Sequence, residues 1–389
     1  MQVPKLRFKE FNDEWQLKKL NEISFEVKRK TTNTNYEVLT ISAKKGFVSQ
    51  KERFSKIIAG GSLEKYNLLK RNEISYNKGA SKSFKYGCVY IQKQYDYALV
   101  PNVYISFSFI NNNPYFYEKL FENHYLDKSL RMMITSTARQ DGLLNIDRKQ
   151  FFNIKVPVPS LEEQTKIANF LSLIDRKIEL QEKLVENLKL YKKGLLQKVF
   201  SNNHGWKSAK LGDFLIEYNK KTTINNQYDI ISSTSNGLYL QKDYFDKQVA
   251  SKNNIGYKIL KLNQIVFSPQ NLWLGNINYN NKFKIGIVSP SYKIYSINQY
   301  YNSTFISYLM TTPNAMYQYK LSSEQGASIV RRNLDLEKFL NITFKIPNIE
   351  EQNRIANLFS NLDKKIDFET NRLTKLKEYK KGLLQQMFI

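Results

Sequence analysis

The sequence has little of what a disulfide-bonded, metal-binding or membrane-spanning protein needs. It holds one cysteine, Cys88, so no intramolecular disulfide and no cysteine metal cluster can form. The longest apolar stretch, VYISFSFI from Val103, is too short to span a bilayer. The first residues lack the apolar core of a signal peptide. We therefore expect a protein of a reducing compartment, the cytoplasm, without membrane contact.

Acidic residues are also scarce. The chain has 60 Lys and Arg against 35 Asp and Glu, which gives a net charge of +25. A surplus of this size concentrates polyanions around a protein, and nucleic acid is the first partner to consider. An acidic membrane surface is the second.

Catalytic motifs are few, and each has a plain structural explanation. AGGS from Ala59 lacks the Gly-Lys-Ser/Thr of a phosphate-binding loop, and His124 and His204 stand alone. NPYF from Asn113 is one residue away from the Asn-Pro-Pro-aromatic motif of amino-methyltransferases, but no glycine-rich cofactor loop accompanies it, so an ordinary turn is favoured. EVK from Glu26, with Asp13 upstream, imitates a metal-nuclease site. The sequence thus indicates a binding surface without a reaction centre.

An internal repeat organises the chain. Residues 159–200 align without a gap with residues 347–388 at an offset of 188, and 21 of the 42 positions are identical. The match continues weakly upstream, where Trp15 pairs with Trp206 and Leu69 with Leu260 at an offset of 191. The chain is therefore two copies of one unit, each with about 145 divergent residues followed by about 42 nearly fixed ones.

The fixed segments are predicted to be long helices. Ser160 with Glu163, and Asn348 with Glu351, occupy the positions of capping boxes. Apolar residues recur every seven positions in two interleaved series, which is the a/d seam of a coiled coil. The predicted seam residues are Ile167, Leu171, Ile174, Ile178, Val185, Leu188 and Leu195 in the first copy, and Phe359, Leu362, Ile366, Leu373, Leu376 and Leu383 in the second. Each helix of about 40 residues would run about 60 Å, and the two are expected to pack on each other.

Polar residues interrupt the seam at equivalent positions. Gln181 and Glu369 share one such position, and Lys192 and Lys380 share another. They could fix the register of the helices, face a further partner, or lie at a solvated edge.

The divergent segments indicate α+β domains. They carry short alternating runs such as GCVYIQ and IGIVS, with Gly and Asn turns and many aromatic residues. We expect one domain over 1–157, a helical region over 158–200, a second domain over 201–346 and a second helical region over 347–389.

Candidate DNA contacts lie where the two copies disagree. Lys and Ser suit phosphates, whereas Asn, Gln and Arg can contact base edges in the major groove. Trp273 stands in the same loops. The candidates are Asn77, Lys78, Ser81, Lys82, Lys85, Arg139 and Gln140 in the first half, and Gln270, Asn271, Trp273, Arg331 and Arg332 in the second. Divergent loops on a common scaffold are expected if each half reads different bases.

These segments carry a family resemblance. PSLEEQTKIANFLSLIDRKI with YKKGLLQKVF, repeated after the second domain, resembles the two conserved regions of the specificity subunit of Type I restriction-modification systems. PKLRFKEFNDEWQLKKL, and YNKGASKSFKYG followed by ARQDGLLNI, resemble the target recognition domains of that family. The resemblance extends over essentially the whole chain.

The resemblance implies a fold and a function. The fold would be two α/β target recognition domains, related by a pseudo-twofold axis and separated by two long helices packed as an antiparallel coiled coil. The domains would read the halves of an asymmetric, interrupted DNA site. Two modification subunits would dock on the helices and bring S-adenosylmethionine for adenine methylation, and two restriction subunits would add ATP- and Mg²⁺-dependent translocation and cleavage. The chain itself would do no chemistry.

Two other functions stay open on the residues alone. A single-chain restriction nuclease would depend on Glu26 and Lys28. A stand-alone bipartite DNA-binding regulator would stay soluble and site-specific without partner subunits, which the predicted apolar helix stripes argue against.

Overall fold

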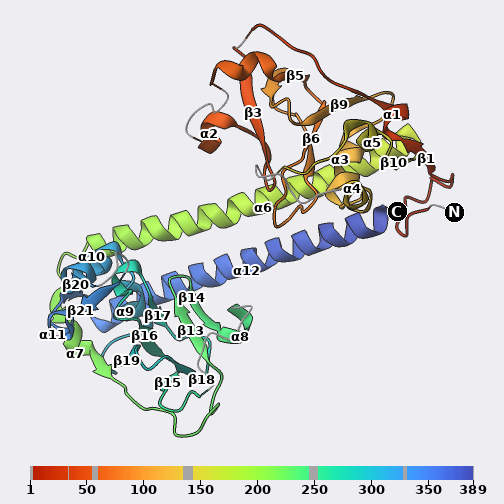
Figure 1. The fold of residues 1–389 in the computed structure, drawn as a ribbon. Helices are drawn as coiled ribbons and strands as arrows, with labels where there is room; N and C mark the ends of the chain where they lie inside the picture. The colour runs from red at the N-terminus through yellow and green to blue at the C-terminus, as the bar shows by residue number, and fades with distance from the viewer. Residues whose placement is uncertain are drawn as a thin grey trace. The chain divides into compact units, whose positions relative to one another are not determined.

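The computed structural model of the chain consists of two units (Figure 1). The first contains residues 1–182 and 371–389, and the second contains residues 183–370. Within them the structure describes residues 3–33, 35–54, 60–134, 143–244, 253–326 and 331–388. Each unit therefore joins one globular domain to parts of two long helices, one from each copy of the repeat.

The two long helices are α6 (Leu161–Ser201) and α12 (Ile349–Met387). They contain 41 and 39 residues, close to the predicted 40. Both begin at the predicted caps, because the Ser160 hydroxyl accepts the Glu163 N–H at 3.2 Å and the Asn348 side chain accepts the Glu351 N–H at 2.9 Å. The side-chain oxygen thus satisfies one of the backbone donors that a helix start leaves free.

The first domain is built on two four-stranded sheets. One has the strand order β2-β9-β6-β7 and the other β4-β3-β8-β5, and β1 pairs with β10. The strands are β1 (Gln16–Lys19), β2 (Ser24–Glu26), β3 (Glu37–Ser42), β4 (Gly46–Ser49), β5 (Asn67–Lys70), β6 (Ile74–Asn77), β7 (Cys88–Ile91), β8 (Tyr97–Val100), β9 (Ile105–Phe109) and β10 (Lys155–Val158). The helices are α1 (Leu20–Ile23), α2 (Gln50–Phe54), η1 (Gly60–Lys65), α3 (Pro114–Glu122), α4 (Asp127–Met133) and α5 (Arg148–Phe152).

The second domain repeats one of these four-stranded sheets and the pairing of its first and last strands. Its four-stranded sheet has the order β12-β19-β16-β17, which matches β2-β9-β6-β7, and β11 pairs with β22 as β1 does with β10. The strands are β11 (Lys207–Lys210), β12 (Leu215–Glu217), β13 (Ile231–Thr234), β14 (Gly237–Leu240), β15 (Lys258–Lys261), β16 (Gln264–Phe267), β17 (Ile277–Tyr279), β18 (Ile285–Val288), β19 (Lys293–Ile297), β20 (Ser323–Gln325), β21 (Arg332–Leu334) and β22 (Thr343–Ile346). The helices are α7 (Leu211–Phe214), α8 (Gln241–Tyr244), η2 (Leu272–Leu274), α9 (Ser303–Leu309), α10 (Pro313–Leu321) and α11 (Leu336–Leu340).

The core of each unit takes in the far end of the other copy's helix. In the first unit Leu383, Met387 and Phe388 join the buried cluster around Trp15, and the rings of Phe388 and Phe116 lie 5.4 Å apart. In the second unit Phe200 at the end of α6 lies 5.4 Å from Phe305. The two contacts are equivalent, since Phe388 and Phe200 differ by 188 positions. Burial of apolar surface thus fixes both ends of the helix pair.

The helices run antiparallel, as contacts within each unit show. In the first unit Lys377 pairs with Glu182 at 2.5 Å, and Lys380, further along α12, pairs with Asp175, further back along α6. In the second unit Lys192 pairs with Asp363, and Phe200 stacks on Phe359 with ring centroids 6.4 Å apart. In each unit an α+β domain is thus joined to antiparallel segments of the two long helices, and the predicted fold class is confirmed.

Several of the predicted seam residues, such as Ile167, Leu171 and Phe359, belong to the buried cores of the two units. Each of the thirteen is buried or half-buried. The polar seam positions Gln181 and Glu369 are buried too, with 7% and 9% of their surface exposed. A solvated edge is therefore wrong for these two positions.

A buried glutamine ties each domain to the start of its helix. Gln164 accepts the Asn113 N–H and donates to the Pro159 carbonyl, both at 2.9 Å. Gln352 makes the same two contacts with Asn302 and Pro347, again at 2.9 Å. Asn113 itself caps α3, so the methyltransferase-like NPYF stretch is a helix start.

Candidate nucleic-acid interface

The first domain brings two of the predicted DNA-binding segments together. The loop after β6 lies beside the segment before α5, because the Leu144 N–H donates to the Lys78 carbonyl at 3.0 Å and Gly79 bridges to Leu143. The Lys78 ammonium donates to the Ile146 carbonyl at 2.9 Å. These bonds join sequence segments 65 residues apart into one surface.

Some polar side chains of this loop bond to the loop itself, and others are exposed to solvent. The Asn77 side chain accepts the Gly79 N–H at 3.0 Å, and the Ser81 hydroxyl accepts the Phe84 N–H at 3.1 Å. Both side chains therefore shape the loop. Lys82 and Lys85 are exposed, so their charges are free to reach a polyanion. Two further candidates, Arg139 and Gln140, lie outside the described residues.

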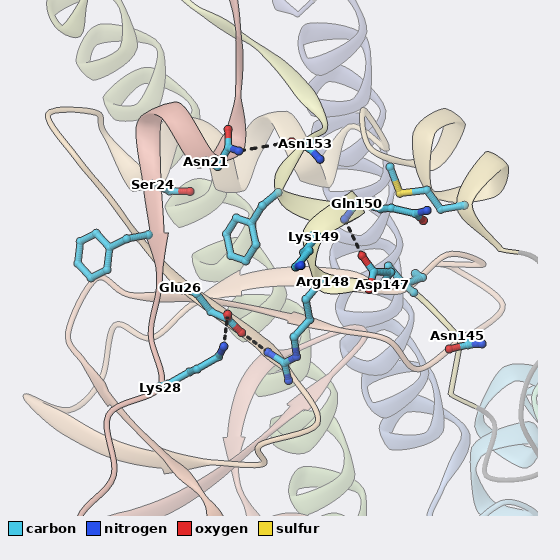
Figure 2. A pocket seen from close by; sticks show the side chains of 14 residues that line it. Asn21, Ser24, Glu26, Lys28, Asn145, Asp147, Arg148, Lys149, Gln150 and Asn153 are labelled. Atoms are coloured by element: carbon cyan, nitrogen blue, oxygen red, sulfur yellow. Dashed lines mark hydrogen bonds and ion pairs between the residues drawn. The ribbon is translucent and has the colours of Figure 1, made fainter.

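A pocket of about 1000 Å³ adjoins this surface, between β2 and α5 (Figure 2). Its rim carries exposed amides and lysines, none of which was among the predicted DNA-binding residues. They are Asn21, Lys28, Asn145, Lys149, Gln150 and Asn153. They come from segments more than 100 residues apart, so no local pattern marks them as a group.

Glu26 lies in the wall of this pocket and is bound by two cations. Its carboxylate pairs with Lys28 at 2.7 Å and with Arg148 (Figure 2). Arg148 also donates to the Asn102 and Tyr104 carbonyls. A nuclease carboxylate would instead share a metal with other acidic groups. The described residues include no cluster of three His, Cys, Asp or Glu side chains that could hold a metal ion, and nothing in them favours the nuclease alternative.

Arg148, in the wall of the pocket, also acts on the nearby Lys30. Burial lowers the pKa of Lys30, and the charge of Arg148 lowers it further. Lys30 donates to the Asn67 side chain at 2.8 Å.

Burial raises the pKa of Cys88 to about 11, so the thiol is protonated at neutral pH. It is a packing residue of strand β7.

The second domain joins the corresponding segments with different side chains. The Arg332 N–H donates to the Gln270 carbonyl at 3.1 Å, and the Arg332 guanidinium lies 5.8 Å from the Trp273 ring centroid. That guanidinium also donates to the Ser323 hydroxyl at 2.9 Å, so it is held in place. Asn271 precedes η2 and its carbonyl accepts the Leu274 N–H.

Gln270 and Arg331 have exposed side chains at this junction. The structure thus groups the five candidates of the second domain, while the first domain offers lysines at the corresponding place. The two domains thus share the strand order of this sheet but expose different side chains in the loops that follow it.

No described helix is long and apolar enough to cross a bilayer.

Comparison with known proteins identifies the family. The family model described as the Type I restriction modification DNA specificity domain matches twice, over residues 12–190 and 203–378. The MjaVIII specificity subunit of a Type I restriction enzyme from Methanocaldococcus jannaschii is 22% identical over 301 residues, which are 68% of this chain and 69% of that protein. A second protein of that organism, described as a putative MjaX specificity subunit, is 22% identical over 281 residues, and the match spans 64% of its length.

Solved structures agree on the fold. The S subunit of a Type I restriction-modification system from M. genitalium matches with a TM-score of 0.60 and 15% identity, over 100% of this chain and 99% of that one. A chain from a study of complex assembly and conformational transition in a Type I system matches with a TM-score of 0.57 and 13% identity, over 98% and 99%. With two copies of the family's domain and its fold, the chain belongs to the DNA specificity subunits of Type I restriction-modification systems.

Proposed function

We propose that each globular domain reads one half of an interrupted, asymmetric DNA sequence and that the helix pair fixes the spacing between the halves. The observation that carries this proposal is the contrast inside the chain. The β6 and β16 sheets have the same strand order, yet the loops that follow them expose Lys82 and Lys85 in one domain and Gln270 in the other. Two copies of one scaffold with different exposed residues suit two unlike half-sites.

The charge of the chain supplies the sequence-independent part of the binding. A net charge of +25 favours the phosphate backbone, and Lys28 and Lys149 lie beside the amides of the pocket rim. Phosphate contacts position a protein on DNA, and amide and guanidinium groups distinguish bases. Both kinds of group border the same surface in the first domain.

The outer faces of the helices suit the modification subunits. Leu180 and Tyr379 are exposed in the first unit, and their equivalents Phe368 and Tyr191 are exposed in the second. Exposed apolar residues of this size at equivalent positions favour two identical partners. Those subunits would bring S-adenosylmethionine, and two restriction subunits would bring ATP and Mg²⁺, while this chain supplies only sequence recognition.

The spacing is tested by removing one turn at the same place in both helices. Deleting residues 181–184 and the equivalent residues 369–372 shortens each helix by about 6 Å. At about 3.4 Å for each base pair, the methylated site should lose about two unread base pairs while both half-sites stay the same. Replacing the eight residues by alanine keeps the length and is the control.

Methylome sequencing of hosts that carry either variant gives the readout. An unchanged spacer in the shortened chain would refute the role of the helices as a ruler. Loss of methylation in both variants would point to the docking of the modification subunits instead.

A further inference from the structure

Glu163, in the first turn of α6, has a buried carboxylate with a specific cation. The Arg7 guanidinium binds it through two hydrogen bonds of 2.7 and 2.8 Å, and the Trp15 indole N–H donates to it at 3.1 Å. The Glu163 side chain is 1% exposed and that of Arg7 is 10% exposed. A two-pronged guanidinium–carboxylate pair of this kind is among the stronger polar contacts in proteins.

Arg7 belongs to an irregular segment, residues 3–13, that we call the strap. Its Leu6 N–H donates to the Gln386 carbonyl at 2.8 Å. The Phe8 ring packs edge-on against Phe170 at 5.9 Å and lies 4.8 Å from the Lys166 ammonium. Lys166 also pairs with Glu10 of the strap.

The second unit has the same surface without a strap. Glu351, Arg354 and Leu358 lie 188 positions after Glu163, Lys166 and Phe170. The side chain of Glu351 is 31% exposed and that of Arg354 is 78% exposed, and Leu358 is 47% exposed. Trp206, the counterpart of Trp15, is half-buried, whereas Trp15 is 3% exposed.

A cavity of about 760 Å³ lies beside these residues and is lined by Trp206, Tyr301, Pro347 and Glu351. Arg354 donates to Glu351 at 2.8 Å, but it does so from the next turn of the same helix and from an exposed position. This surface stays uncovered because the connection between α6 and the second domain is short. Helix α6 ends at Ser201, and the few residues before Trp206 are too short to form a strap.

We propose that this Glu351 pocket binds a segment of the modification subunit that carries an arginine followed by an aromatic or large apolar residue. The arginine takes the place that Arg7 has on Glu163, and the neighbouring residue covers Leu358 as Phe8 covers Phe170. This rests on the proposed function, because it assumes a modification subunit. A second copy of this chain is a poor occupant, since its strap is already engaged in its own first unit.

The pocket chemistry is tested with a peptide of the strap sequence, Val3 to Asp13, added to the full-length chain. Binding is followed by fluorescence anisotropy of a labelled peptide. We expect saturable binding that weakens about tenfold when the arginine of the peptide is replaced by glutamine, and by a similar factor in the Glu351→Gln chain. Glu350→Gln, at the exposed neighbouring position, is the control and should bind the peptide normally.

The proposed pocket would be contradicted if the strap peptide and its arginine-to-glutamine variant bound equally well. Equal binding of the strap peptide by the Glu351→Gln and wild-type chains would also contradict it. The occupant is tested by repeating the titration with the assembled complex of this chain and its modification subunits. We expect the complex to bind the peptide at least tenfold more weakly than the free chain. A complex that binds it as well as the free chain contradicts the assignment to that subunit.

Site-specific methylation by the same complex is measured in parallel. If methylation is normal while the peptide results fail, the pocket proposal is wrong and the proposed function stands. If the wild-type complex methylates no specific site, the proposed function is at fault.

Discussion

The ammonium of Lys380 on α12 lies 2.5 Å from the Asp175 carboxylate on α6. Lys380 also pairs with Glu122, and Asp175 with Lys119, both from α3, so the cluster joins the two helices to the first domain. At the repeat offset of 188, the equivalents of Lys380 and Asp175 are Lys192 and Asp363. These two residues also form an ion pair, in the second unit. One ion pair is therefore made twice, and in each unit it sets the register of the antiparallel helices.

The second version of this contact differs in one partner. Tyr308 stands where the first unit has Lys119, and its hydroxyl donates to Asp363 at 2.7 Å. The aspartate and the lysine are common to both units. The residue that the globular domain adds differs, because it is Lys119 in the first unit and Tyr308 in the second. Half-buried ion pairs add modest stability, but removing one partner leaves the other without compensation.

Replacing Lys380 by methionine should therefore lower the free energy of unfolding by about 1–3 kcal/mol, because Asp175 and Glu122 lose a partner. In the double variant Asp175→Asn/Lys380→Met the loss should be smaller than the sum of the single losses by about 1 kcal/mol. Urea unfolding measures all three variants. Lys381→Met, at the exposed next position, is the control, and strict additivity of the two single variants would argue against the pairing.

The same cluster predicts a pH dependence. Burial alone would raise the pKa of Asp175, but the charges of Lys119 and Lys380 outweigh it and hold the pKa below its usual value. A lowered folded-state pKa means that the contribution to stability is present above the unfolded pKa of about 3.9 and is lost as the pH falls through the folded value. The stability difference between the wild type and Asp175→Asn should thus be constant above about pH 5 and shrink below about pH 4. A difference that grows on acidification would contradict the pairing; urea midpoints from pH 6 to pH 3 decide it.

Much of this architecture could be predicted from the sequence. The heptad series from Ile167 and the caps at Ser160 and Asn348 are local patterns, so they gave both helices with their starts. The polar seam position of Lys192 and Lys380 was recognised, but its partners were not. Asp175 directly follows the seam residue Ile174, and its meeting with Lys380 depends on how the helices cross and where α3 packs.

Less of the candidate site than of the fold could be predicted from the sequence. Loop chemistry indicated Lys82, Lys85 and Gln270, which are exposed, but also Asn77 and Ser81, whose side chains bind their own loop. A sequence does not distinguish a loop-shaping amide from a reading one. The pocket between β2 and α5 was missed because its wall, including Glu26 and Arg148, is assembled by the tertiary fold.

Lys82 and Lys85 should act on phosphates. Replacing both with alanine should weaken binding to specific and unrelated DNA alike and reduce the slope of log K against log salt by about 2. The methylated sequence should stay the same. Lys364→Ala/Lys365→Ala on α12 removes the same charge from exposed helix positions and should leave the slope unchanged. Equal slopes for both double variants would show that the loop has no special contact.

Gln270 should read a base. Its side chain is exposed while its backbone carbonyl holds Arg332, so alanine removes the amide and keeps the loop. We expect Gln270→Ala to relax one position of a single half-site, with a discrimination loss of about 1–3 kcal/mol. Competition binding against a library of single-base variants measures it. Gln385→Ala on α12 serves as the control, and relaxation in both half-sites would contradict one domain reading one half.

This chain should give its complex specificity for a bipartite DNA sequence. Methylome sequencing of a host with and without the intact gene for this chain tests it most directly. The account predicts an interrupted, asymmetric motif with methylated adenines in both halves that disappears when the chain is absent. A motif that persists without the chain, or one that is continuous rather than split, would contradict it.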